Sequence, residues 1–259
     1  MAGRALVRQV SASFAEALRR DTEGPCPELG PARTQHAAYR RALLEIGLEL
    51  EVLPALDMCP DACFVEDRLL TARGCALLTW SRTPCRRGES ASLYEVLAQR
   101  MPVTVMDGGA DGALDGGDVI QLGEHLLVGL SERTDARGVA TLQRWARDLN
   151  ITVQVLPHSE GLHLKCSATP LGPKTLLCSE DWSHISALPS WVDVLRVPAT
   201  ESYAANAVYN GDAVVMAEGY PVAASRVAET GRRVLLVDLS AFKVADGALT
   251  CLSVVFREK

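Results

Sequence analysis

Three side chains far apart in the sequence have the types needed for nucleophilic catalysis. Cys251 follows a threonine where a polar lead gives way to an apolar C-terminal run, His163 lies between two leucines, and Asp115 precedes two glycines. A thiolate is a strong, soft nucleophile, an imidazole can donate and accept a proton, and a carboxylate can orient that imidazole. Each residue alone is more typical of a structural role. The three become informative when a fold brings them together.

A loose repeat along the chain predicts such a fold. Five segments each have a polar or glycine-rich entry followed by a short apolar run, and all but the last continue through a turn into another strand. They start at Asp61, Asp115, Gly161, Ser202 and Gly247, at intervals of 41 to 54 residues. Self-similarity at such intervals is typical of repeat and propeller architectures. We therefore expect five modules around an axis, with their entry segments converging at one end.

Helices and strands alternate between these entries, which predicts an α/β protein. Apolar residues at helical spacing indicate four helices, and each is followed closely by a β-like run. The expected helices are 35–46, 91–100, 134–149 and 222–230, and the expected strands are 48–53, 103–106, 151–156 and 233–238. No composition break marks a linker, so we expect a single domain over residues 1–259.

The composition excludes several classes of protein. The 259 residues are 48% hydrophobic and carry 26 Lys and Arg against 32 Asp and Glu, a formal net charge of −6. Such a chain can bury a large core, and its acidic balance offers no general field for nucleic acid or an anionic membrane. It contains no apolar run as long as a membrane span, and charged residues interrupt its first twenty positions. We expect a cytoplasmic protein with no nucleic-acid or membrane partner.

The cysteines also indicate a cytoplasmic protein. The eight cysteines form no CxxC pair and no Cys/His cluster at zinc spacing. In a reducing compartment, most of them are expected to be small buried side chains.

Seven short motifs follow one another along nearly the whole chain. They are CPDACFVED (59–67), RRGE (86–89), LDGGDV (114–119), GLSERT (129–134), LHLK (162–165), ESYAAN (201–206) and DGALTC (246–251). In this order and spacing they closely resemble the dimethylarginine dimethylaminohydrolases, members of the guanidino-group modifying superfamily that includes arginine deiminases and amidinotransferases. The resemblance implies a five-bladed α/β propeller of ββαβ-type modules, the pentein fold, in agreement with the five modules above.

The resemblance also implies a role for each matched residue. Cys251 would attack the guanidinium carbon of a methylated arginine, His163 would protonate the departing amine and then activate water, and Asp115 would orient His163. The implied substrate-binding residues are Asp67 and Glu66 at the guanidinium, Asp61 at the α-ammonium, Arg86 and Arg133 at the α-carboxylate, and the backbone of Leu18 and Ala245 at the amino-acid end. Carboxylates match a planar, forked cation, and charged groups at the other end would select a free amino acid.

Three functions follow as alternatives. The preferred one is hydrolysis of free dimethylarginine or monomethylarginine to citrulline and an amine through a covalent thiouronium. Arginine deimination or amidino transfer is disfavoured by the compact length and by Leu-His-Leu-Lys, where deiminases have an acidic residue after the histidine. A non-catalytic binding protein is disfavoured because Cys251, His163 and Asp115 are retained together.

None of these alternatives requires an organic cofactor or a catalytic metal, although a thiolate beside an imidazole could capture zinc as an inhibitor. The sequence does not distinguish a monomer from a homodimer, nor a preference for methylated arginine from one for plain arginine. Residues 21–33, rich in Pro and Gly, are the best candidate for a mobile lid over the pocket.

Overall fold

The computed structural model describes residues 3–157 and 162–256, and within these ranges the strands form five three-stranded sheets. Four sheets combine two antiparallel neighbours with a third strand that runs parallel to the second. These sheets are β3 (Leu69–Ala72), β4 (Cys75–Leu78), β5 (Val103–Val105); β6 (Val119–Leu122), β7 (His125–Gly129), β8 (Thr152–Leu156); β9 (Ala168–Pro170), β10 (Thr175–Ser179), β11 (Asp193–Val197); and β12 (Val208–Asn210), β13 (Ala213–Ala217), β14 (Arg233–Val237).

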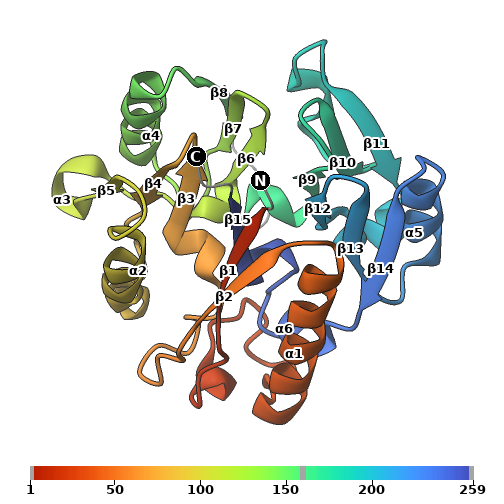
Figure 1. Ribbon diagram of the computed structural model, residues 1–259, viewed down its shortest axis with the longest axis horizontal. Coiled ribbons are helices and arrows are strands. Elements are labelled where there is room, and N and C mark those ends of the chain that lie inside the picture. The colour runs from red at the N-terminus through yellow and green to blue at the C-terminus, as the bar shows by residue number, and fades with distance from the viewer. Residues whose placement is uncertain (1–2, 158–161, 257–259) are drawn as a thin grey trace.

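The fifth sheet joins the two ends of the chain and closes the ring. Its strands are β15 (Ser253–Phe256), β1 (Arg4–Arg8) and β2 (Glu49–Leu53), with Leu6 opposite Val254 in the antiparallel pair. Figure 1 shows the five sheets arranged around a central axis. The predicted α/β propeller of five modules is confirmed, and the last module has one strand of its own because the N-terminus supplies the next. Gly161, the expected start of one module, lies outside the described residues.

Helices lie around the outside of the ring (Figure 1). They are α1 (Leu29–Glu45), α2 (Ser90–Leu97), α3 (Gly108–Asp111), α4 (Ala136–Asp148), α5 (Pro221–Ala228) and α6 (Ser240–Lys243). The four predicted helices and the strands that follow them are confirmed. Helix α4 is capped as expected by Asp135, whose carboxylate accepts the Gly138 N–H.

Two predictions about these elements need correction. Helix α1 begins at Leu29, before the expected 35, because Pro31 is accommodated in its first turn, where no intrahelical N–H bond is lost. Residues 29–33 are therefore helical, and only 21–28 remain of the expected lid loop. Helix and strand do not alternate throughout, because β10 and β11 are joined by a segment whose only helical element is the short 3₁₀ helix Ile185–Ala187.

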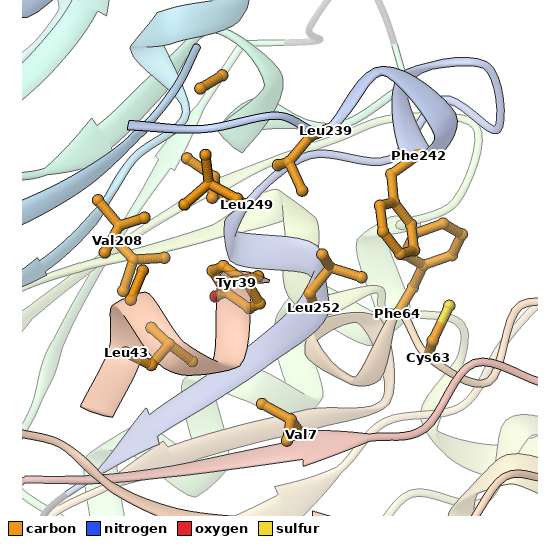
Figure 2. Packing of buried hydrophobic residues seen from close by; sticks show 14 of the residues in the cluster. Val7, Tyr39, Leu43, Cys63, Phe64, Val208, Leu239, Phe242, Leu249 and Leu252 are labelled. Carbon is orange, nitrogen blue, oxygen red and sulfur yellow. The ribbon is translucent and has the colours of Figure 1, made fainter. Parts of the chain in front are cut away.

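The core between α1 and the axis holds the two ends of the chain together. Tyr39 and Leu43 of α1 are fully buried, and the Tyr39 hydroxyl shares a 2.7 Å hydrogen bond with Ser253 Oγ. Nearby, the rings of Phe64 and Phe242 pack edge-on at 6.2 Å (Figure 2). This packing fixes the segment before β3 beside the segment before β15, near the axis.

Two further observations concern the exposure of the cysteines and the possibility of a membrane-spanning helix. Only Cys63 and Cys178 are buried, so the expectation that most cysteines are buried is wrong. Cys26 and Cys85 lie instead in exposed loop or 3₁₀ segments. In the described part of the chain, no helix combines the length and the apolar character needed to cross a membrane.

Candidate active site

Each sheet is entered through a short 3₁₀ helix. These entry helices are η2 (Val65–Arg68), η4 (Gly116–Asp118), η5 (Leu164–Cys166), η7 (Ala199–Ala205) and η8 (Thr250–Leu252). Helix η2 contacts both η4 and η8, and η4 contacts η5. The entries that carry the expected catalytic residues therefore converge, as the repeat predicts.

The convergence brings His163 against Asp115. Imidazole Nε2 lies 3.2 Å from Asp115 Oδ2, and both side chains are buried. Because Nε2–H is donated to Asp115, Nδ1 is the nitrogen left to face the cavity, 3.8 Å from Asp67 Oδ1. Burial opposes protonation of the ring, but the carboxylates of Asp67, Asp115 and Asp118 outweigh it and raise the pKa of His163 to about 9. The imidazole is thus held as a proton donor.

Asp67 is an ionised carboxylate with one hydrogen-bonded oxygen and one oxygen that has no hydrogen bond among the described residues. Its Oδ2 accepts from Arg86 Nη1 at 2.5 Å, whereas its buried Oδ1 has no hydrogen-bond partner among the described residues. Burial favours its neutral form, but the charges of His163, Arg86 and Arg68 prevail and hold the pKa of Asp67 well below its usual range. A buried, unpaired carboxylate oxygen is costly unless a donor reaches it. A cationic ligand with N–H groups would supply that donor.

Asp67 lines a cavity with an empty volume of about 600 Å³. The cavity brings together eight of the ten predicted site residues: Leu18, Asp61, Asp67, Arg86, Arg133, His163, Ala245 and Cys251. The described residues that also line it are Arg19, Arg20, Phe64, Leu162, Asp246 and Gly247. Asp115 and Glu66 do not line it and lie behind its wall.

Glu66 is engaged on the far side of Cys251. Its Oε1 accepts from Lys165 Nζ at 2.6 Å and its Oε2 from the Thr250 hydroxyl at 2.7 Å, and it lines a second cavity of about 840 Å³. Asn206 in turn donates to Thr250 Oγ1 and accepts the Thr250 N–H, each at 2.9 Å. The structure therefore does not bring Glu66 to the expected substrate position; its oxygens instead bind Lys165 of η5 and Thr250, the residue before Cys251.

Cys251 is a neutral thiol in this environment. Burial raises its pKa well above the ordinary value, and the nearby carboxylates Glu66 and Asp67 raise it further. A cation placed between Asp67 and the sulfur would reverse this electrostatic balance and favour the thiolate.

The mouth of the cavity presents charges of both signs. Asp61 accepts the Leu18 N–H at 3.2 and 3.3 Å through its two oxygens, and burial raises its pKa to about 6 against the opposing charge of Arg86. Arg133 donates to Thr83 Oγ1 at 2.8 Å. Arg86 is more committed than expected, because Glu89 takes two of its N–H groups at 2.9 Å in addition to Asp67. Arg86 therefore fixes Asp67 as well as lining the cavity.

Sequence reasoning missed several buried polar groups that support the site. Arg68, to which the sequence analysis assigned no role, is 1% exposed and pairs with Asp115. Asp118 accepts the Leu164 N–H at 3.1 Å and the hydroxyls of Ser131 and Thr134, each at 2.6 Å. Asp118 and its hydrogen-bond partners lie within the seven motifs. A charged residue inside the glycine-rich segment 114–119 was therefore the sequence feature that could have indicated a buried role for Asp118.

Donor atoms of Asp67, Asp115 and His163 lie within 4.8 Å of one another, a spacing that could also suit a cation. Arg68 and Arg86 already neutralise the two carboxylates through direct ion pairs. We therefore interpret these residues as an ion-pair network that sets the protonation of His163.

Comparisons with known proteins match most of the chain. The arginine deiminase family model matches residues 55–180. The chain is 38% identical over 256 residues to N(G),N(G)-dimethylarginine dimethylaminohydrolase from Streptomyces coelicolor, covering 98% of this chain and 97% of that one. It is 32% identical over 232 residues to the enzyme of the same name from Pseudomonas aeruginosa, covering 89% and 90% of the two chains.

Solved structures show the same fold. The Pseudomonas aeruginosa enzyme, as a Cys-to-Ser variant complexed with citrulline, has a TM-score of 0.91 and 30% identity, with 99% and 100% of the chains covered. The N-terminal domain of a cyanobacterial arginine dihydrolase has a TM-score of 0.87 at 19% identity, covering 100% and 98%, a likeness of fold alone. The fold and the site define a hydrolase that acts on C–N bonds. The chain belongs to the dimethylarginine dimethylaminohydrolase family.

Proposed function

We propose that the protein hydrolyses free Nω-methylated arginine to citrulline and methylamine or dimethylamine. The observation that carries this proposal is the buried Asp67 carboxylate, which lines the same cavity as Cys251 and His163 and whose Oδ1 has no hydrogen-bond partner among the described residues. A guanidinium supplies both the charge and the N–H donors that this oxygen lacks. The names of the relatives that match most of the chain support the same substrate class.

In the first step, the substrate guanidinium donates to Asp67 and lies beside the sulfur of Cys251. Its charge offsets the carboxylates that keep the thiol protonated, so the thiolate forms on binding and the thiol proton is released to solvent. Sγ attacks the guanidinium carbon, and His163 Nδ1–H protonates the departing nitrogen. The C–N bond breaks, the neutral amine leaves, and a thiouronium remains on Cys251.

In the second step, the imidazole is neutral and accepts a proton from water. The hydroxide adds to the thiouronium carbon, and collapse of the adduct breaks the C–S bond, loses the hydroxyl proton to solvent and releases citrulline. The thiolate is restored, and the proton stays on His163 beside Asp115 and Asp67, whose charges stabilise the imidazolium. One residue thus acts first as acid and then as base.

At the mouth, Asp61 binds the α-ammonium and Arg133 with Arg86 binds the α-carboxylate, and backbone carbonyls of Leu18 and Ala245 complete the amino-acid end. All of these residues line the cavity. An arginine inside a peptide lacks both end charges and would leave these groups unpaired, which disfavours protein substrates. The partner is therefore a small molecule. We place the reaction in the cytoplasm, since all eight cysteines are free thiols.

The test is citrulline release from dimethylarginine, monomethylarginine and arginine supplied separately. Release from the methylated substrates is expected, with loss in Cys251→Ser and full retention in Cys75→Ser, a matched control at a cysteine outside the cavity lining. A preference for plain arginine would move the protein to the deiminase reaction. Absence of citrulline with all three substrates would contradict hydrolysis and leave amidino transfer or simple binding.

A further inference from the structure

Arg68 carries a buried charge that the proposed reaction does not use. Its side chain is 1% exposed and is not among the residues that line the cavity. Nη2 donates to the carbonyls of Asp67 at 2.7 Å and Leu114 at 3.3 Å, and it forms an ion pair with Asp115 Oδ1. The other oxygen of Asp115 contacts His163. Arg68 therefore stands behind the aspartate, on the side opposite the imidazole.

We propose that Arg68 is a positioning residue for the Asp115–His163 pair: its ion pair with Oδ1 holds the fully buried Asp115 carboxylate so that Oδ2 points toward His163 Nε2.

The need for such a cation follows from where Asp115 lies. A carboxylate with no exposed surface takes up a proton unless it is paired and hydrogen-bonded. Asp67 and Asp118 are anions facing the same imidazole, so they add repulsion. Arg86 is committed to Asp67 and Glu89. Among the described residues, the direct cationic partners of Asp115 are thus Arg68 and His163 itself.

The groups that surround His163 set the expected effect of losing Arg68. The titratable and charged side chains around the ring come from η2, η4, η5, η8 and the segment before α2, and they are Asp67, Arg68, Asp115, Asp118, Cys166, Cys251 and Arg86. Without Arg68, Asp115 Oδ1 loses its ion pair and the carboxylate is no longer held with Oδ2 against Nε2. The hydrogen bond to Asp115 is one of the interactions that raise the pKa of His163, so its loss lets the imidazole release its proton at lower pH.

This inference rests on the proposed function, and its test includes a readout that needs no turnover. Arg68→Gln removes the charge but keeps a donor toward the two carbonyls, and Arg68→Lys keeps the charge. The titration of His163 is followed by NMR of histidine-labelled protein, with His163→Gln used to assign the signal. We expect the midpoint to fall by about one pH unit or more in Arg68→Gln, and to change little in Arg68→Lys.

The same variants are then assayed for citrulline release. In Arg68→Gln we expect kcat to fall about 10- to 100-fold, with KM within about threefold, and the alkaline limb of the pH profile to move in the direction of the NMR midpoint. A folded but merely loosened protein would lose activity without moving either midpoint. In an Asp115→Asn background, Arg68→Gln should leave the His163 midpoint unchanged, because Arg68 acts through Asp115.

An unchanged or higher His163 midpoint in Arg68→Gln would overturn the proposal, and so would an equal shift in the Asp115→Asn background. If Arg68→Gln does not fold, Arg68→Met, which removes the buried polar group altogether, is read against the same criteria. Absence of citrulline release from the unmodified protein would contradict the proposed function alone, since the NMR titration still reports on Arg68.

Discussion

Thr250 donates its hydroxyl to Glu66 Oε2 at 2.7 Å, across 184 residues of sequence. This bond ties the residue before the nucleophile to the entry of the first sheet, one residue before the carboxylate that faces the substrate cavity. The side-chain amide of Asn206 donates to the Thr250 hydroxyl oxygen and accepts the Thr250 backbone N–H. One buried polar network therefore fixes the positions of Cys251, the proposed nucleophile, and Asp67, the proposed guanidinium-binding carboxylate, and its loss should be measurable.

Replacing Thr250 by valine keeps the side-chain shape but removes the hydroxyl. Glu66 Oε2 is then left without this donor inside a buried site, and an unsatisfied buried acceptor costs about 1–3 kcal/mol of the free energy of unfolding. Thr250→Ser keeps the hydroxyl and serves as the matched control, with a smaller loss expected. Urea unfolding measures both. Equal stability of the valine and serine variants would contradict a structural role for this bond.

Much of this architecture could be predicted from local pattern, and some of it could not. The helices that precede β2, β5, β8 and β14 follow from periodicity, since one apolar stripe per helix packs on one sheet. The segment 180–192 does not form the corresponding helix, and its Trp182 is buried in the core instead. Tertiary packing overrode the regularity of the repeat at that point.

The site divides in the same way. The residues that line the cavity occur in motifs that a resemblance can identify one by one. Arg68 gave no such signal, because a cation next to two acidic residues ordinarily forms an exposed pair of little energy. Its actual partner, Asp115, is 47 residues away and becomes its neighbour when η2 meets η4. The residues next to Arg68 in the sequence therefore do not indicate its contact with Asp115.

The pH dependence of substrate binding should report on Asp61. Burial raises its pKa to about 6, so the carboxyl takes up a proton as the pH falls through that value and loses its attraction for the substrate ammonium. We expect KM to rise below about pH 6, and to be raised about 10- to 100-fold and made independent of pH in Asp61→Asn. Steady-state kinetics between pH 5 and about 8 measure this. A substrate analogue without the α-amino group is the control, and equal pH dependence of both substrates would rule the assignment out.

Gly117 approaches His163 too closely for any side chain. A Cβ at this position would lie 2.6 Å from both Cγ and Nδ1 of the imidazole, so Gly117→Ala must push the ring away from its contact with Asp115. We expect kcat to fall about 100-fold, within the range for general acid–base catalysis, with little change in KM. Gly30→Ala is the matched control, because a Cβ there meets nothing within 4 Å and replaces a helical glycine. Full activity of Gly117→Ala would show that the ring can move without cost.

The stability of the protein should fall as pH rises, in a window set by His163. The pKa of this residue is raised from 6.5 to about 9, so the folded state binds its proton more tightly than the unfolded chain does. A raised pKa adds stability that is fully present below the unfolded value and is lost as the pH rises through the folded one. Protonation of His163 therefore contributes about 3 kcal/mol to the free energy of unfolding at low pH, and this contribution is lost as the pH rises from the unfolded to the folded pKa.

The difference in unfolding free energy between the unmodified protein and His163→Gln isolates this term. The thiols of Cys166 and Cys178, whose pKa values desolvation raises to about 11, also lower the stability of the folded state in alkali, but they do so in both proteins. We therefore expect the gap between the two urea-unfolding curves to be widest near pH 6 and to close by about pH 9. A gap that stays constant across this window would mean that His163 is neutral in the folded state, and the first proton transfer would then need another donor.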